Sequence, residues 1–76
     1  MALLRLPEVI RLSGYSRSML YALISQGLYP KPVKISERAV AWISYEVAAI
    51  NQARIAGKSN DELRTLVSQF LIARQG

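Results

Sequence analysis

The amino-acid sequence predicts a mainly α-helical domain that contains one small β-hairpin. Three observations lead to this prediction. Apolar residues recur with helical spacing in both halves of the chain, Pro30 and Pro32 interrupt this pattern, and the stretch after them alternates with the period of a strand. A chain of 76 residues can build one compact core, so we expect a small folded domain without a deep catalytic cleft.

Two short helices are expected in the first third of the chain, joined by a tight turn. The first, over residues 7–13, begins with a proline, which is tolerated in the first turn of a helix, and ends before Gly14. The second, over residues 17–26, has Ser16 as its N-cap and ends at Gly27. Because the connection is so short, we expect the two helices to pack at a steep angle, as in a helix-turn-helix.

The segment after the second helix cannot remain helical, because Pro30 and Pro32 impose an extended path. A β-hairpin is predicted next, with one face formed by Val33, Ile35, Val40 and Trp42. We expect Trp42 to belong to the core rather than to form a platform on which bases stack. Two angled helices followed by a hairpin make a winged helix-turn-helix, in which the hairpin is the wing.

Two further helices complete the predicted fold. Ser44 is the expected N-cap of the third, which ends at Gly57. The fourth, over residues 60–74, starts with the capping-box pair Ser59 and Glu62. Five large apolar residues recur along one face of this helix: Leu63, Leu66, Val67, Phe70 and Leu71.

The chain is therefore divided into a winged helix-turn-helix domain over residues 1–56 and a C-terminal helix over residues 57–76. The apolar stripe of the C-terminal helix has two alternative uses. It packs on the domain, or it pairs with a second copy of the chain to form a homodimer or a cooperative DNA-bound oligomer.

The charge distribution favours a polyanionic partner. The chain has ten basic and five acidic residues and a net charge of +5. Residues 1–38 contain six of the basic and two of the acidic residues, a net charge of +4, so the positive field belongs to the predicted helix-turn-helix half. A basic cluster attracts nucleic acid through counterion release.

The sequence lacks the residue types that most enzymes and metal sites require. The chain has no histidine and no cysteine, and its carboxylates do not have the spacing of metal ligands, so we expect neither an enzyme nor a metal, cofactor or small-molecule site. The N-terminus does not have the pattern of a secretory signal, and no apolar run approaches the length needed to cross a bilayer. We expect a cytoplasmic protein.

The start of the second helix holds the first candidate DNA-binding residues. Arg17 and Ser18 lie in its first turn, from which side chains reach base edges in a major groove. For Ser16 the structural role of N-cap comes first, although the neighbouring backbone N–H groups could also bind a phosphate. Tyr21, one turn further on, either contacts a phosphate through its hydroxyl or packs on the core.

The predicted wing holds the remaining candidates, which are Lys31, Lys34 and Arg38. Wings of this type lay basic side chains along the phosphates beside the groove that the recognition helix fills. The neighbouring Glu37 could pair with one of these side chains and reduce its contribution.

Over residues 3–50 the sequence resembles the AlpA family of phage and prophage regulators, small members of the MerR-like winged-helix class that also includes many excisionases. Four segments carry the resemblance: Leu4-Arg5-Leu6-Pro7-Glu8-Val9, Gly14-Tyr15-Ser16-Arg17-Ser18 with Leu20-Tyr21, Gly27-Leu28-Tyr29-Pro30-Lys31-Pro32-Val33, and Ala41-Trp42-Ile43 with Glu46-Val47. The chain departs from the family at Ala22, where a basic residue is common, and at Ile50, where a second tryptophan is common.

The resemblance implies a DNA-binding regulator of a prophage or mobile element. Its role would be either to activate an integrase gene or to direct excision by bending the attachment-site DNA. The competing hypothesis is a protein-interaction adaptor or anti-repressor that uses the C-terminal apolar stripe and does not bind DNA.

Overall fold

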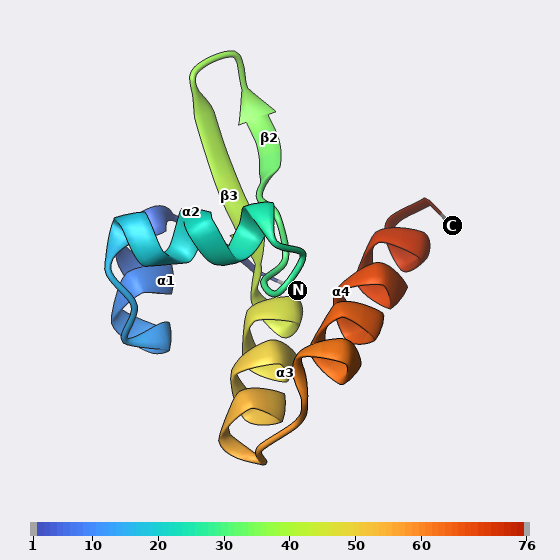
Figure 1. Cartoon of the computed structure of the whole chain (residues 1–76). Coiled ribbons are helices and arrows are strands. Elements are labelled where there is room, and N and C mark those ends of the chain that lie inside the picture. The colour runs from blue at the N-terminus through green and yellow to red at the C-terminus, as the bar shows by residue number, and fades with distance from the viewer. Residues whose placement is uncertain (1, 76) are drawn as a thin grey trace.

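The structure, a computed structural model, describes residues 2–75 and confirms the predicted winged helix-turn-helix fold with an additional C-terminal helix. In this range the chain forms four helices and a three-stranded antiparallel sheet with strand order β1-β3-β2, and the β2–β3 hairpin projects from the helices (Figure 1). The elements in chain order are β1 (Leu3–Leu4), α1 (Leu6–Ser13), α2 (Arg17–Ser25), β2 (Val33–Ser36), β3 (Ala39–Ile43), α3 (Ser44–Ile55) and α4 (Asn60–Gln75). Among the described residues, no helix combines the length and apolar character needed to cross a membrane.

The turn between α1 and α2 forms as the sequence predicts. Gly14 ends α1 in the left-handed conformation, with φ at 78°, which an L-residue with a side chain rarely adopts. Ser16 is the N-cap of α2, and its hydroxyl accepts a hydrogen bond of 3.2 Å from the N–H of Met19. Tyr15, between them, packs edge-on against the ring of Tyr29 at a centroid distance of 6.2 Å, which ties this turn to the core.

A third strand, β1, joins the predicted hairpin and was not expected from the sequence. Leu3 pairs with Ile43 and Leu4 with Trp42, so that β3 becomes the central strand of the sheet. A strand of two residues has no periodic pattern of its own, and it forms because β3 offers it a free edge.

The prediction that Ser44 caps α3 is wrong, because the N-terminal segment binds to Ser44. Ile43 occupies the N-cap position and makes no side-chain capping bond, and Ser44 is already helical. The Ser44 hydroxyl instead accepts a hydrogen bond of 3.1 Å from the N–H of Ala2, and the Ser44 N–H donates one of 2.8 Å to the Ala2 carbonyl. The approach of the N-terminal segment therefore takes up the side chain that would otherwise cap the helix.

The predicted alternation of buried and exposed residues fails at both ends of the wing. Ile35 lies where the register between β2 and β3 is irregular, and it is 44% exposed because the wing projects beyond the helical body (Figure 1). Ala41 is buried, although it does not belong to the face predicted from Val33, Ile35, Val40 and Trp42. The base of β3 is enclosed by β1, β2, α1 and α3, so consecutive residues there are buried irrespective of the face on which they lie.

The hydrophobic core is centred on Trp42, which is fully buried as predicted, and it draws side chains from all four helices. Trp42 donates a hydrogen bond of 3.0 Å from Nε1 to the carbonyl of Pro30. The stripe of α4 contributes to this same core. Three of its residues are buried there, namely Leu63, Val67 and Phe70, while Leu66 and Leu71 are partly buried.

We expect Trp42→Ala to lower the free energy of unfolding by about 3–5 kcal/mol, because it removes a buried aromatic side chain and leaves a cavity. Tyr45→Ala is a control, since Tyr45 is an exposed aromatic residue and should change stability by about 0.5 kcal/mol or less. Chemical denaturation measures both values. Equal losses in the two variants would contradict the central position of Trp42.

We expect acidification to weaken the start of α4. Backbone and side-chain hydrogen bonds with Ser59 lower the pKa of Glu62 below its ordinary value. Such a carboxylate contributes stability that is fully present above its ordinary pKa and is lost as the pH falls through the lowered pKa. Glu62→Gln keeps an acceptor but does not titrate, so the difference in thermal midpoint between the two proteins should shrink over this pH range. A difference that stays constant with pH would contradict the assignment.

Candidate nucleic-acid interface

Helix α2 has a buried face and an exposed face. Leu20 and Leu23 anchor the helix in the core. The opposite face is exposed and carries the residues Arg17, Ser18, Tyr21, Ala22 and Ser25. These positions recur at helical spacing, so they form one continuous surface that a major groove about 12 Å wide can accept.

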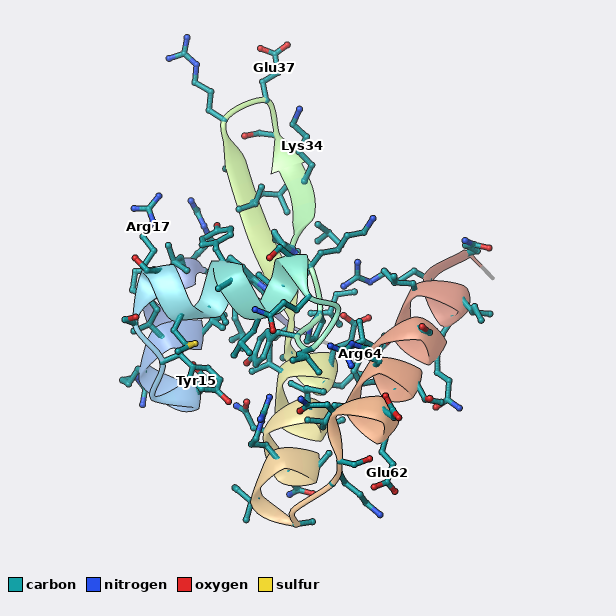
Figure 2. The ribbon with its side chains drawn as sticks, in the orientation of Figure 1. Tyr15, Arg17, Lys34, Glu37, Glu62 and Arg64 are labelled. Atoms are coloured by element: carbon teal, nitrogen blue, oxygen red, sulfur yellow. The ribbon has the colours of Figure 1, made fainter. Side chains whose placement is uncertain are left out.

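The first turn of α2 places two of the predicted DNA-binding side chains on this face. Arg17 projects away from the body of the domain (Figure 2), and Ser18 beside it is also exposed. The hydroxyl of Ser16 is already bound to the N–H of Met19, so this residue has the structural role expected of an N-cap. An arginine is unfavourable at the positive end of a helix dipole unless an anion approaches, and this position is therefore suited to a polyanion.

Tyr21 packs on the core, which is one of the two roles that the sequence left open. Its ring packs edge-on against Trp42, with centroids 6.2 Å apart and planes at 68°. The residue is nevertheless 38% exposed. Tyr21 thus connects the exposed face of α2 to the buried base of β3.

The predicted basic residues of the wing are all exposed, but they lie on different parts of it. Lys31 precedes the wing, Lys34 lies on β2 opposite Val40, and Arg38 follows Glu37 in the turn between the strands. Lys34 and Glu37 project from the part of the wing that extends beyond α2 (Figure 2). In the described part of the chain, Glu37 forms no ion pair with any of the three basic residues. Their positive charge therefore remains available to a ligand.

Two arginines that the sequence did not single out bind the segment that connects α2 with the wing. Arg64 and Arg74, both on α4, donate hydrogen bonds to backbone carbonyls of the segment between α2 and the wing. Arg74 also pairs with Glu46, a fully buried carboxylate on α3. A signal for this pair existed, because Glu46 lies three residues after the buried Ile43 and four before the buried Ile50, and a carboxylate on such a face needs a cation. No comparable signal marks Arg64.

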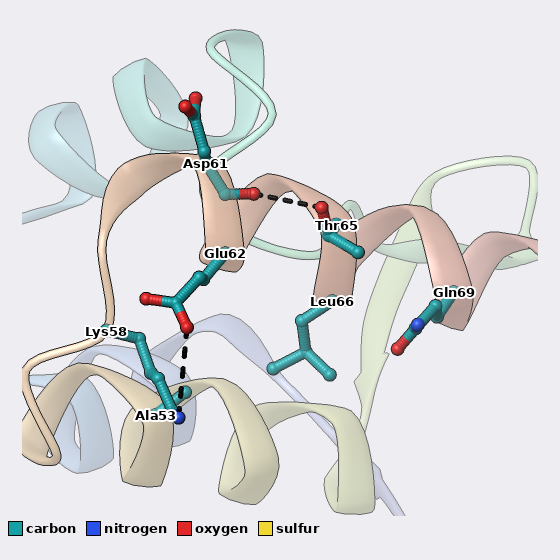
Figure 3. A pocket seen from close by; sticks show the side chains of 7 residues that line it. All are labelled: Ala53, Lys58, Asp61, Glu62, Thr65, Leu66 and Gln69. Carbon is teal, nitrogen blue, oxygen red and sulfur yellow. Dashed lines mark hydrogen bonds and ion pairs between the residues drawn. The ribbon is translucent and has the colours of Figure 1, made fainter.

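A hollow of about 410 Å³ lies beside the start of α4 (Figure 3). Its lining is Ala53, Lys58, Asp61, Glu62, Thr65, Leu66 and Gln69. The polar groups here interact with one another at the start of α4. Nζ of Lys58 lies 3.9 Å from Oε2 of Glu62, and the Thr65 hydroxyl donates a hydrogen bond of 3.0 Å to the Asp61 carbonyl.

The family model that matches the chain covers α1, α2, the wing and α3 but not α4. A family model described as "Prophage CP4-57 regulatory protein (AlpA)" matches residues 2–55. An uncharacterized protein, ORF88 of Enterobacteria phage P4, is 47% identical over 55 residues, which are 72% of this chain and 62% of that protein. The chain thus spans less than two thirds of the length of this curated relative. No solved structure matches the chain.

We expect Ser16→Ala to destabilise the protein by about 0.5–2 kcal/mol, because it removes the acceptor that caps the N–H of Met19. Ser18→Ala is the matched control, since this exposed hydroxyl lies within the helix and should change stability by about 0.5 kcal/mol or less. Thermal unfolding without DNA measures both changes. If Ser18→Ala proved the more damaging of the two, the capping role of Ser16 would be wrong.

Proposed function

Because the chain belongs to the AlpA family of prophage regulatory proteins, as its sequence resemblance indicated, we propose that it regulates a prophage or mobile element by binding specific sequences in double-stranded DNA. The observation that carries this proposal is the pairing of an exposed, polar α2 face with an unneutralised basic wing. A face that served only the fold would not need Arg17 at the positive end of the helix dipole.

In the proposed binding mode, α2 and the wing contact different parts of the DNA. The exposed face of α2 enters the major groove, where Arg17 donates two hydrogen bonds to a guanine and Ser18 contacts a base edge or a phosphate. The methyl group of Ala22 lies against the groove, and the Tyr21 hydroxyl reaches the DNA backbone. Lys34 and Arg38 lie along the phosphates beside the groove, with Lys31 at the base of the wing.

The regulatory outcome follows from where this surface binds. Family resemblance favours either activation of an integrase gene or control of excision, and one DNA-binding surface serves both. Footprinting on the DNA that flanks the gene of this protein separates them. Protection at an integrase promoter supports activation, whereas protection at an attachment site supports a role in excision.

We propose no catalytic activity for this chain. It contains neither histidine nor cysteine, the side chains that most often serve as general base, metal ligand or thiol nucleophile. In the proposed function, DNA is bound without chemical change.

The alternative function as a protein-interaction adaptor depended on the apolar stripe of α4. Leu63, Val67 and Phe70 of this stripe are buried in the core of their own chain. An adaptor, or a second copy of the chain, would have to use other residues. Sedimentation at high micromolar concentration, with and without DNA, measures whether copies associate.

We expect Arg17→Ala to weaken binding to the specific DNA site by about 1–3 kcal/mol and to relax the preference at one base pair, because a bidentate base contact is lost. Arg54→Ala removes the same charge from α3 and should change affinity little. Titrations at several salt concentrations test this. A wild-type affinity that does not fall with salt would contradict DNA binding and favour the adaptor.

A further inference from the structure

Helix α4 contacts the chain between α2 and the wing at two separate points. Arg64 donates a hydrogen bond of 3.0 Å from Nε to the carbonyl of Gln26. Arg74 donates one of 2.8 Å from Nη2 to the carbonyl of Lys31. Gln26 is the C-cap of α2, and Lys31 lies two residues before β2, so these two bonds are at opposite ends of the connection.

The Arg64 contact matches the end of a helix in charge and shape. The last carbonyls of α2 carry the negative end of the helix dipole, which a guanidinium stabilises. Gly27 follows with φ at 75°, and a Cβ built on it would lie 3.8 Å from Cγ of Arg64. The aliphatic part of Arg64 therefore lies over the turn itself, and Figure 2 shows its side chain between α4 and the end of α2.

The Arg74 contact is oriented by a buried carboxylate. Arg74 donates a hydrogen bond of 2.9 Å from Nε to Oε2 of Glu46, and its Nη2 contacts the other carboxylate oxygen. Because Glu46 is fully buried on α3, the guanidinium has one orientation, and its Nη2 is directed at the Lys31 carbonyl as well. This places a fixed donor at the base of the wing.

We propose that α4 is a brace that sets the position of the wing relative to α2, with Arg64 and Arg74 as positioning residues for DNA binding. The inference rests on the proposed function, since its benefit is to a protein that uses α2 and the wing at once. Two elements that bind one duplex gain affinity when their relative position is set beforehand, because less conformational entropy is lost on binding. Both arginines lie outside the residues that the family model matches.

The geometry of the brace can be measured without DNA. The chain has no cysteine, so Ser18→Cys on α2 and Glu37→Cys on the wing accept two spin labels at known positions. We expect a narrow distance distribution with Arg64 present, a broader one with Arg64→Ala, and no broadening with the charge-matched control Arg54→Ala. An unchanged distribution in Arg64→Ala, in protein that is folded by circular dichroism, overturns the brace.

The effect on DNA is measured in the unlabelled protein. We expect Arg64→Ala to bind the specific site about 3- to 10-fold more weakly than Arg54→Ala, although neither residue is in the proposed interface. The slope of affinity against salt should also fall further in Arg64→Ala, because wing–phosphate contacts are lost. Equal affinity and equal slope in the two variants refute positioning for DNA, even if the distances broaden.

Failure of the proposed function gives a different result, namely a wild-type protein that shows no salt-dependent binding. The distance measurement then still decides whether the brace exists.

Arg74 needs a different variant, because removing it alone leaves the buried charge of Glu46 without a partner. The pair Glu46→Leu with Arg74→Met avoids this, and we expect it to fold and to broaden the label distances as Arg64→Ala does. A narrow distribution in the pair variant excludes Arg74 from the brace.

Discussion

The indole of Trp42 is fully buried at the point where β3, α2 and the proline segment meet. Its Nε1–H is bound to the carbonyl of Pro30, and its ring contacts that of Tyr21 on the exposed face of α2. Trp42, which lies on β3 of the wing, thus connects the proline segment before the wing with α2, the helix proposed to bind the major groove. Leu4 of β1 pairs with Trp42 in the sheet, so the same residue also joins the N-terminal strand to the wing.

The proposed interface depends on this arrangement because α2 offers few side chains able to read bases. Arg17 is the only long, charged residue on its outer face, and Ala22 occupies the middle of it. In the proposed binding mode, affinity for DNA therefore comes in part from the wing, whose basic residues are exposed and not paired with Glu37 in the described chain. A protein that divides binding between two elements in this way needs both in a defined relative position.

Helix α4 contributes to the fold at two levels. Its apolar residues complete a core that a chain of this length could otherwise fill only partly. Its arginines add polar contacts, of which the pair with Glu46 is the most restrictive. A buried ion pair contributes little net stability compared with apolar residues of the same size, but it penalises any docking of α4 that leaves Glu46 without a partner. A docking of α4 that keeps Glu46 paired with Arg74 is therefore favoured over one that separates them.

Local patterns were sufficient to predict the helices, the wing and the candidate residues on them. A glycine with positive φ, a serine cap or a capping box acts within a few neighbouring residues, and so Gly14, Ser16 and the pair of Ser59 with Glu62 could be identified from spacing alone. The features decided by tertiary structure all join residues that are distant in sequence. Strand β1 exists because β3 has a free edge, Ser44 bonds Ala2 instead of capping its helix, and Ile35 is exposed because the wing outreaches the core. Likewise, Arg64 and Arg74 reach the carbonyls of Gln26 and Lys31 only after α4 has packed on α3, since no periodicity in the sequence records which backbone groups a folded helix will face.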